Sequence, residues 1–162
     1  MPVCYRIRQF VRTVRQPQAP PDLGRLAGLL SAEQRALFSS LAVVDQYHCL
    51  AVAQALAAQG HEQPDLLRAA LVHDIGKARA HISTWERVAH VLLMRCAPTL
   101  AGRLGSARAG EGGHGLYVLA HHAALGGDLA AQAGLAPAVV ALVRGDGDPQ
   151  LQAALRDADD TQ

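Results

Sequence analysis

The stretch that decides the fold is Leu66–Lys77, which reads LLRAALVHDIGK. Apart from one arginine, its first seven residues are leucine, alanine or valine, a composition that favours a buried helix. Pro64 and Asp65 stand directly before it and are typical of a helix start, whereas Gly76 is expected to end or bend the helix. We therefore predict a helix from Leu66 to Ile75 that carries an adjacent histidine and aspartate at its buried end.

The rest of the chain has the same character. Half of its 162 residues are hydrophobic and only 4% are aromatic. Strands favour β-branched and aromatic residues, while alanine and leucine favour helix. No segment alternates long enough to predict a strand, and no internal repeat is present. The composition therefore predicts an all-α fold, and the length suits a single domain with one core.

Capping residues and prolines divide the chain into six to eight helices. The predicted starts are Ser31, Asp45, Leu66, Ser83, Leu116, Pro137 and Pro149. Ser31 and Ser83 begin capping boxes, because a glutamine or a glutamate follows three residues later. Gly60 is expected to end the second helix, and Gly126 with Gly127 to break the one that starts at Leu116. Six glycines in residues 102–115 predict a mobile loop there.

A basic segment precedes the helical domain. In residues 1–15, apolar side chains recur at helical spacing with arginines on the other side, which predicts a first helix packed on the core. Residues 16–21 form a proline-containing connector. We predict an N-terminal basic segment and linker over 1–21 and one helical domain over 22–162.

Charge and cysteine content exclude several classes of protein. The net charge is +1, so the chain lacks the basic field that drives nucleic-acid binding. Its three cysteines include no CxxC pair, which argues against a disulfide framework or a thiolate zinc site and favours a reducing cytoplasm. No apolar run reaches the roughly 20 residues that span a bilayer. Charged residues make up only 18%, a surface that would tolerate a homodimer interface.

The pair His73-Asp74 is the central chemical signal. Buried imidazoles and carboxylates need partners, and a metal ion is a common one. His48 lies on the preceding predicted helix among apolar neighbours, so it is expected to point towards the core. Two antiparallel helices joined by a short loop would bring His48 to the dyad. These three ligands suit a divalent ion, whether Mn, Fe, Co, Ni, Zn or Mg.

At these residues the chain resembles the HD superfamily of metal-dependent phosphohydrolases, whose pattern is H…HD…D. His48 matches the first histidine of that pattern, and His73 with Asp74 matches the dyad. The resemblance covers roughly His48 to the C-terminus. It implies an HD-domain-like helical bundle that hydrolyses a nucleotide or related phosphoester with a metal-activated water. Lys77, in the string HDIGK, would then stabilise charge on the phosphoryl oxygens.

The closing aspartate of the pattern has three candidates. The segment that starts at Leu155 resembles the family's L-x-x-A-D ending, which selects Asp159 as the fourth metal ligand. Asp146 and Asp128 are the alternatives.

A second metal is the least clear implication of the resemblance. Members that bind two metals have further histidines after the dyad, and His122, four residues before Gly126, fits the H-x-x-x-G spacing. Where another metal histidine would follow, this chain has Gly145-Asp146. His122 with Asp146 would therefore hold a second ion, or His122 would donate a proton to the leaving group.

Three functions of different classes follow from these residues. The first is a phosphohydrolase that acts on a small phosphorylated substrate, with Asp74, Lys77 and His122 as catalytic residues. The second is a degenerate module that binds metal or nucleotide without turnover. The third is a structural helical domain in which the His-Asp pair is satisfied within the core.

Overall fold

The computed structural model describes residues 19–80 and 114–162 of the chain. These residues form six α-helices and two 3-10 helices, with no strand among them, which confirms the predicted all-α bundle. In chain order they are η1 (Gly24–Leu29), α2 (Ala32–Ser39), α3 (Val43–Ala58), α4 (Pro64–Val72), η2 (Ile75–Arg79), α7 (His114–Gln132), α8 (Pro137–Arg144) and α9 (Pro149–Thr161). The basic segment 1–15, the helix predicted from Ser83 and the glycine-rich residues 102–113 lie outside the described residues.

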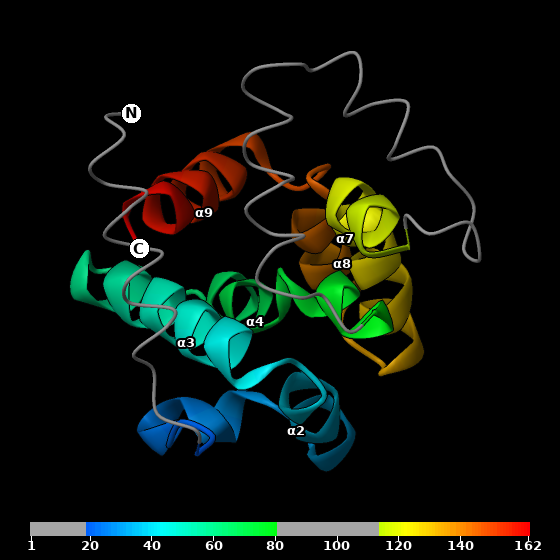
Figure 1. Cartoon of the computed structure of the whole chain (residues 1–162). Helices are drawn as coiled ribbons and strands as arrows, with labels where there is room; N and C mark the ends of the chain where they lie inside the picture. The colour runs from blue at the N-terminus through cyan, green and yellow to red at the C-terminus, as the bar shows by residue number, and fades with distance from the viewer. Residues whose placement is uncertain (1–18, 81–113) are drawn as a thin grey trace.

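Helix α4 lies in the middle of the bundle, as the decisive stretch predicted. It packs against α3, α8, α9 and η1, and Figure 1 shows α3 and α9 on one side of it and α7 with α8 on the other. Leu66, Ala69, Ala70, Leu71 and Val72 are all completely buried. Full burial of a leucine stabilises a fold by about 1.5–3 kcal/mol, so this short helix anchors both halves of the described chain.

Helix α4 ends three residues earlier than predicted. The last helical residue is Val72, and His73 and Asp74 have backbone angles of −58°, −31° and −93°, 4°. Those are the angles of the two central residues of a type I turn. Successive side chains on a helix diverge by about 100°, but here the turn directs both polar side chains towards the same point between the helices.

Glycines end three of the helices by the same device. Gly60, Gly134 and Gly145 have positive φ angles after α3, α7 and α8. After α3, the His61 N–H donates to the Leu56 carbonyl and the Gly60 N–H to the Ala57 carbonyl, which is the Schellman pattern. The predicted end at Gly60 is therefore confirmed.

The predicted helix starts at Pro137 and Pro149 are confirmed, since α8 and α9 begin at these residues. The start at Ser31 is confirmed as well, whereas that at Asp45 is corrected. Ser31 and Gln34 form the predicted capping box, each accepting from the other's backbone N–H. Asp45, in contrast, does not cap α3. The N-cap is Ala42, and Asp45 lies buried in the first turn of the helix, because its side chain faces the interior near Lys77.

The predicted break at Gly126 and Gly127 is wrong, because α7 is continuous from His114 to Gln132. Both glycines are buried and permit close packing. A Cβ on Gly126 would lie 3.2 Å from the Val143 side chain, and one on Gly127 would lie 2.3 Å from Cγ of Arg144. They therefore serve the contact between α7 and α8 rather than a turn.

Among the described helices, none is both long and apolar enough to cross a membrane.

The Schellman ends provide a matched test of the fold. Alanine at Gly60 meets no atom within 4 Å but must adopt a φ near 88°, which destabilises an L-residue by about 1–2 kcal/mol. We expect Gly60→Ala to lower the free energy of unfolding by that amount in urea denaturation. Gly28→Ala is the control, since its Cβ also meets nothing within 4 Å and its φ is not positive. Equal stability of the two variants would contradict the assignment.

Candidate metal centre

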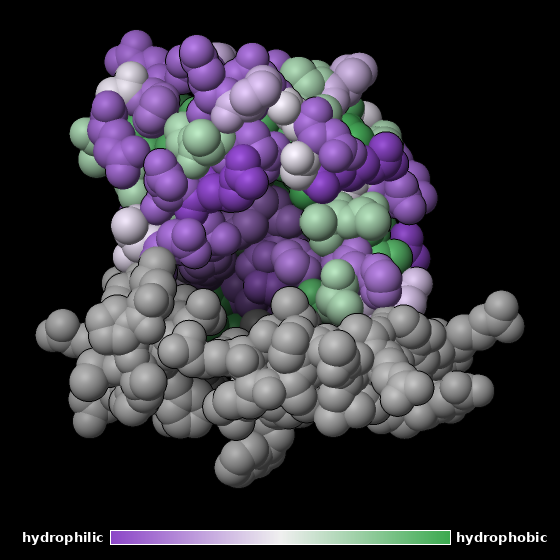
Figure 2. All heavy atoms as spheres, turned by 90° about the horizontal axis from the view of Figure 1, so that it is seen from above, coloured by the Kyte–Doolittle hydropathy of each residue, from purple (hydrophilic) through white to green (hydrophobic). Residues whose placement is uncertain are grey.

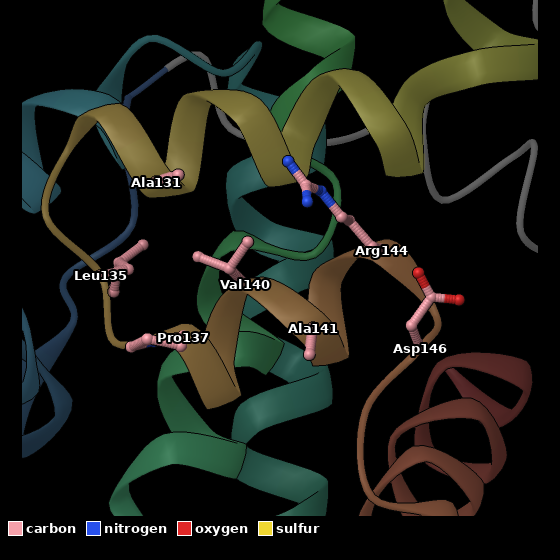
Figure 3. Close-up of a pocket in the computed structure, with 7 residues that line it drawn as sticks. All are labelled: Ala131, Leu135, Pro137, Val140, Ala141, Arg144 and Asp146. Carbon is pink, nitrogen blue, oxygen red and sulfur yellow. The ribbon is translucent and has the colours of Figure 1, made fainter.

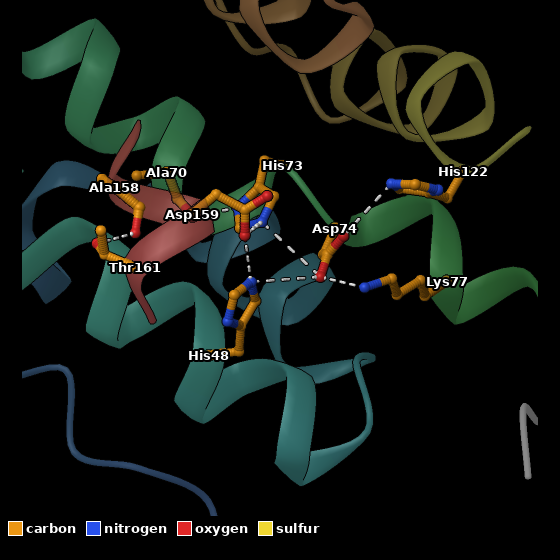
Figure 4. A network of polar contacts seen from close by, with 9 residues as sticks. All are labelled: His48, Ala70, His73, Asp74, Lys77, His122, Ala158, Asp159 and Thr161. Atoms are coloured by element: carbon orange, nitrogen blue, oxygen red, sulfur yellow. Dashed lines mark hydrogen bonds and ion pairs between the residues drawn. The ribbon is translucent and has the colours of Figure 1, made fainter. Parts of the chain in front are cut away.

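Four polar side chains meet where α3, the dyad turn and α9 come together (Figure 4). The Nε2 atom of His48 lies 2.8 Å from Oδ1 of Asp159 and 3.9 Å from Oδ2 of Asp74. The Nε2 atom of His73 lies 3.6 Å from Oδ1 of Asp159 and 3.8 Å from Oδ2 of Asp74. Each imidazole nitrogen therefore faces both carboxylates.

These separations lie within about 0.5 Å of those expected between ligands of a single ion. Ligand atoms about 2.0–2.2 Å from one divalent ion lie roughly 3.0–3.4 Å apart in octahedral or tetrahedral geometry. The four separations measured here range from 2.8 to 3.9 Å. The donor atoms of His48, His73 and Asp74 all lie within 4.8 Å of one another, so this group could hold a metal ion. Asp159 adds a further oxygen beside both imidazoles.

The His73 ring is oriented as a metal ligand requires. Its Nδ1 lies 2.9 Å from the Ala70 carbonyl, and because a carbonyl only accepts, Nδ1 must carry the hydrogen. In the neutral ring, Nε2 then has a lone pair that points at the two carboxylates. That atom is buried and has no hydrogen-bond partner, which costs free energy unless a proton or a metal ion binds there. A backbone carbonyl behind a ligating histidine is a common means of fixing its tautomer.

The His122 ring is fixed in the same way, by a backbone carbonyl, on the other side of Asp74. Its Nδ1 donates to the Leu119 carbonyl at 2.8 Å, and its Nε2 lies 3.6 Å from Oδ1 of Asp74. His48 and His73 face the other oxygen, Oδ2. Asp74 therefore lies between His48 and His73, which face its Oδ2, and His122, which faces its Oδ1 (Figure 4).

Lys77 forms a close ion pair with Oδ2 of Asp74, one turn of the chain away. Burial lowers the pKa of Lys77, but Asp74, and after it Asp45, more than compensate and raise that pKa above 10.5. The lysine is therefore a fixed cation at neutral pH. Its side chain is 18% exposed, so part of it remains accessible from solvent.

The two carboxylates of the cluster attract positive charge. Burial alone would raise the pKa of Asp74, but the Lys77 ammonium, and then the surrounding imidazoles, hold that pKa well below 3.8. Burial opposes the shift at Asp159 too, yet His48 and His73 keep its pKa low. Burial lowers the pKa of His73, whereas Cys49 and the two carboxylates raise it well above 6.5. Two ionised carboxylates thus attract either a proton or a metal ion to the imidazoles.

The structure brings most of the predicted site residues together. His48, His73, Asp74 and Asp159 form the centre, and Lys77 and His122 flank it. Among the three candidates for the closing aspartate, only Asp159 contacts the imidazoles in the described part of the chain.

Asp146 and Asp128 lie elsewhere. Asp128 is exposed and pairs with Arg144 at 2.6 Å. Asp146 is exposed and lines an apolar groove beside α8 (Figure 3). It also borders Pro64, at the opposite end of α4 from His73, and nine helical residues separate those ends by about 13 Å. Asp146 is therefore not brought to the centre, because Gly145 turns the chain away after α8.

Two residues near the centre were not predicted to take part. Asp45 contributes negative charge to Lys77, and the fully buried Cys49 lies beside His73. Their positions three residues before and one residue after His48 place all three on adjoining parts of one helix face. That spacing was the only signal in the sequence that could have indicated them.

Comparison with known proteins gives no relative: neither a protein-family model, nor a curated protein, nor a solved structure matches the chain. The resemblance to the HD superfamily therefore rests on the sequence motifs alone.

The charge pattern predicts a stability maximum for the protein after removal of metal with a chelator. Carboxylates with lowered pKa values stabilise the fold fully above their ordinary value of 3.8, and that stabilisation is lost as pH falls. A histidine with a raised pKa stabilises fully below 6.5, and its contribution is lost as pH rises through the raised value. We expect the free energy of unfolding to be highest between about pH 4 and 6.5 in urea titrations with chelator.

Asp159→Asn provides the comparison for that profile. It removes one of the two low-pKa carboxylates, so its loss of stability between pH 5 and 3 should be smaller than that of the wild-type chain. Parallel profiles for the two proteins would show that Asp159 does not interact with the imidazoles in solution.

Proposed function

We propose that this chain is a metal-dependent phosphohydrolase of the HD type, which hydrolyses a nucleotide or related phosphoester. The observation that carries the proposal is the buried Nε2 of His73, which lacks a hydrogen-bond partner and faces two ionised carboxylates. Such an arrangement favours a bound cation. The four residues that match the H…HD…D pattern in the sequence, His48, His73, Asp74 and Asp159, support the proposal because they lie close together.

The proposed ligands of a divalent ion are His48, His73, Asp74 and Asp159. Nitrogen and oxygen donors of this kind suit Mn, Fe, Co, Ni, Zn or Mg. When bound, such an ion lowers the pKa of a water ligand and polarises a phosphoryl oxygen. The chain itself supplies the orientation, because backbone carbonyls fix the rings and the dyad turn fixes the carboxylate.

Lys77 is proposed to bind the phosphoryl oxygens. It is held as a cation by Asp74 and Asp45, so it would act by its charge and not as a base. A preorganised positive charge at the reacting phosphate stabilises charge that develops in the transition state.

His122 is proposed to move a proton. Its Nδ1 is committed to the Leu119 carbonyl, so Nε2 is the nitrogen that can exchange a proton with the leaving group. A second ion held by His122 and Asp146 is less well supported than proton transfer by His122, since Asp146 lies beside α8 and not at the centre.

The nature of the surface supports a charged ligand. Seen from above, the described surface is hollowed, and the visible walls of the hollow are mostly hydrophilic (Figure 2). Polar walls favour a polar ligand over an apolar one.

A module that binds metal without turnover is the second candidate. The position of Asp146 favours it, because one ligand of a two-metal site is missing from the centre. Metal content alone does not separate the two candidates, whereas turnover does.

Metal content tests the ligand set. We expect elemental analysis to find about one transition-metal ion per chain in the wild type and almost none in His73→Ala, because His73 supplies a central donor. His61→Ala is the matched control, since His61 follows α3 outside the centre and should leave metal content unchanged. No metal in the wild type after addition of Mn, Co and Ni would exclude the metal-centre proposal.

Turnover tests the role of Lys77. With metal added, we expect Lys77→Met to keep its ion but to lose about 100-fold or more in kcat on bis(p-nitrophenyl) phosphate, the loss typical of one removed charge-stabilising donor. Arg79→Gln, two residues on and exposed, should stay near the wild-type rate. An unchanged kcat in Lys77→Met would place the lysine in a structural role, and absence of wild-type turnover would favour the binding module.

A further inference from the structure

The backbones of η2 and α7 approach each other closely at Gly76. Gly76 lies in η2, two residues after Asp74, and packs against α7 at His122. A Cβ built on Gly76 would lie 1.9 Å from the His122 carbonyl oxygen and less than 3 Å from two further backbone atoms of that residue. No side chain, not even that of alanine, fits between η2 and α7 at this point.

A second glycine faces the same contact from α7. Gly126 lies one helical turn after His122, and a Cβ there would lie 3.1 Å from the Gly76 nitrogen and 3.4 Å from the Ile75 side chain. Residues four apart lie on one face of a helix. The face of α7 that carries His122 is thus pressed against the backbone that follows the His-Asp dyad.

This contact decides how far His122 lies from Asp74. The imidazole of His122 is tied to its own helix, because its Nδ1 donates to the Leu119 carbonyl. With the ring fixed on α7, the distance of 3.6 Å between Nε2 and Oδ1 of Asp74 depends on where α7 lies relative to η2. Gly76 is a residue at which the backbones of the two elements lie in direct contact.

We propose that Gly76 is a positioning residue that sets His122 against Asp74 by allowing α7 to pack directly on the backbone of η2. The proposal rests on the proposed function only for its effect on turnover, since the geometry is independent of it. A methyl group at position 76 must move the two backbones apart by about 1 Å or more to reach ordinary contact. A misplacement of about 1 Å can lower an enzymatic rate by about 100-fold.

The structural arm of the test measures geometry without substrate or metal. We expect a crystal structure of Gly76→Ala to show the distance from His122 Nε2 to Asp74 Oδ1 lengthened by about 1 Å or more from 3.6 Å. Gly126→Ala should lengthen it by a few tenths of an ångström, because its Cβ contacts are tight but not prohibitive. Gly28→Ala, whose Cβ meets nothing, should leave it unchanged. An unchanged distance in Gly76→Ala overturns the proposal.

The kinetic arm asks whether Gly76 acts through His122. With Mn²⁺ and bis(p-nitrophenyl) phosphate, we expect Gly76→Ala and His122→Ala each to lower kcat by about 100-fold, and the double variant to be little worse than His122→Ala. Residues that act through one another show such non-additivity, whereas a general loss of packing would add a further 100-fold. Additive losses therefore overturn the proposal.

The experiments distinguish failure of the proposed function from failure of the proposed role of Gly76. If the wild type turns over no phosphoester, the proposed function fails, while the crystallographic distance still decides the role of Gly76. If Gly76→Ala does not fold, Gly126→Ala provides the test instead. We expect that variant to fold, because alanine favours helix more than glycine does. An unchanged His122–Asp74 distance in a folded Gly126→Ala would then overturn the proposal.

Discussion

The buried carboxylate of Asp74 is the constraint around which the described helices are arranged. It is 2% exposed and ionised, and an isolated charge in that position would be very unfavourable. Its compensation comes from separate elements: His48 on α3, Lys77 on η2 and His122 on α7. Removing any of these elements would leave a buried charge short of a partner, so the packing of α3, η2 and α7 and the electrostatics of the centre depend on each other.

Asp74 reaches this position because the last turn of α4 is apolar and the helix ends in a tight turn. The buried residues of α4 hold the dyad deep in the bundle, and the type I turn at His73-Asp74 presents both side chains to α3 and α9. A largely hydrophobic helix thus places a charged group in the interior. A buried charge at this turn opposes stability, and proteins commonly hold functional groups at such positions.

Features set by neighbours in the chain could be predicted from the sequence, and features set by distant contacts could not. The capping box at Ser31 and the helix end at Gly60 depend on local hydrogen bonds and on φ, and both were predicted correctly. The unbroken helix at Gly126 was missed because the glycine there serves packing against η2 and α8. Asp159 was preferred over Asp146 as the closing aspartate because of the resemblance to the HD superfamily. The position of Asp146 beside α8 depends on the turn at Gly145.

The position of Asp159 on α9 also bears on the order in which the centre is assembled during synthesis. Helix α9 is the last of the described elements to leave the ribosome, whereas α3 and the dyad are made much earlier. Until α9 docks, the imidazoles of His48 and His73 face Asp74 alone. The Asp159 carboxylate therefore joins the other three side chains only after α9 folds onto α3 and α4.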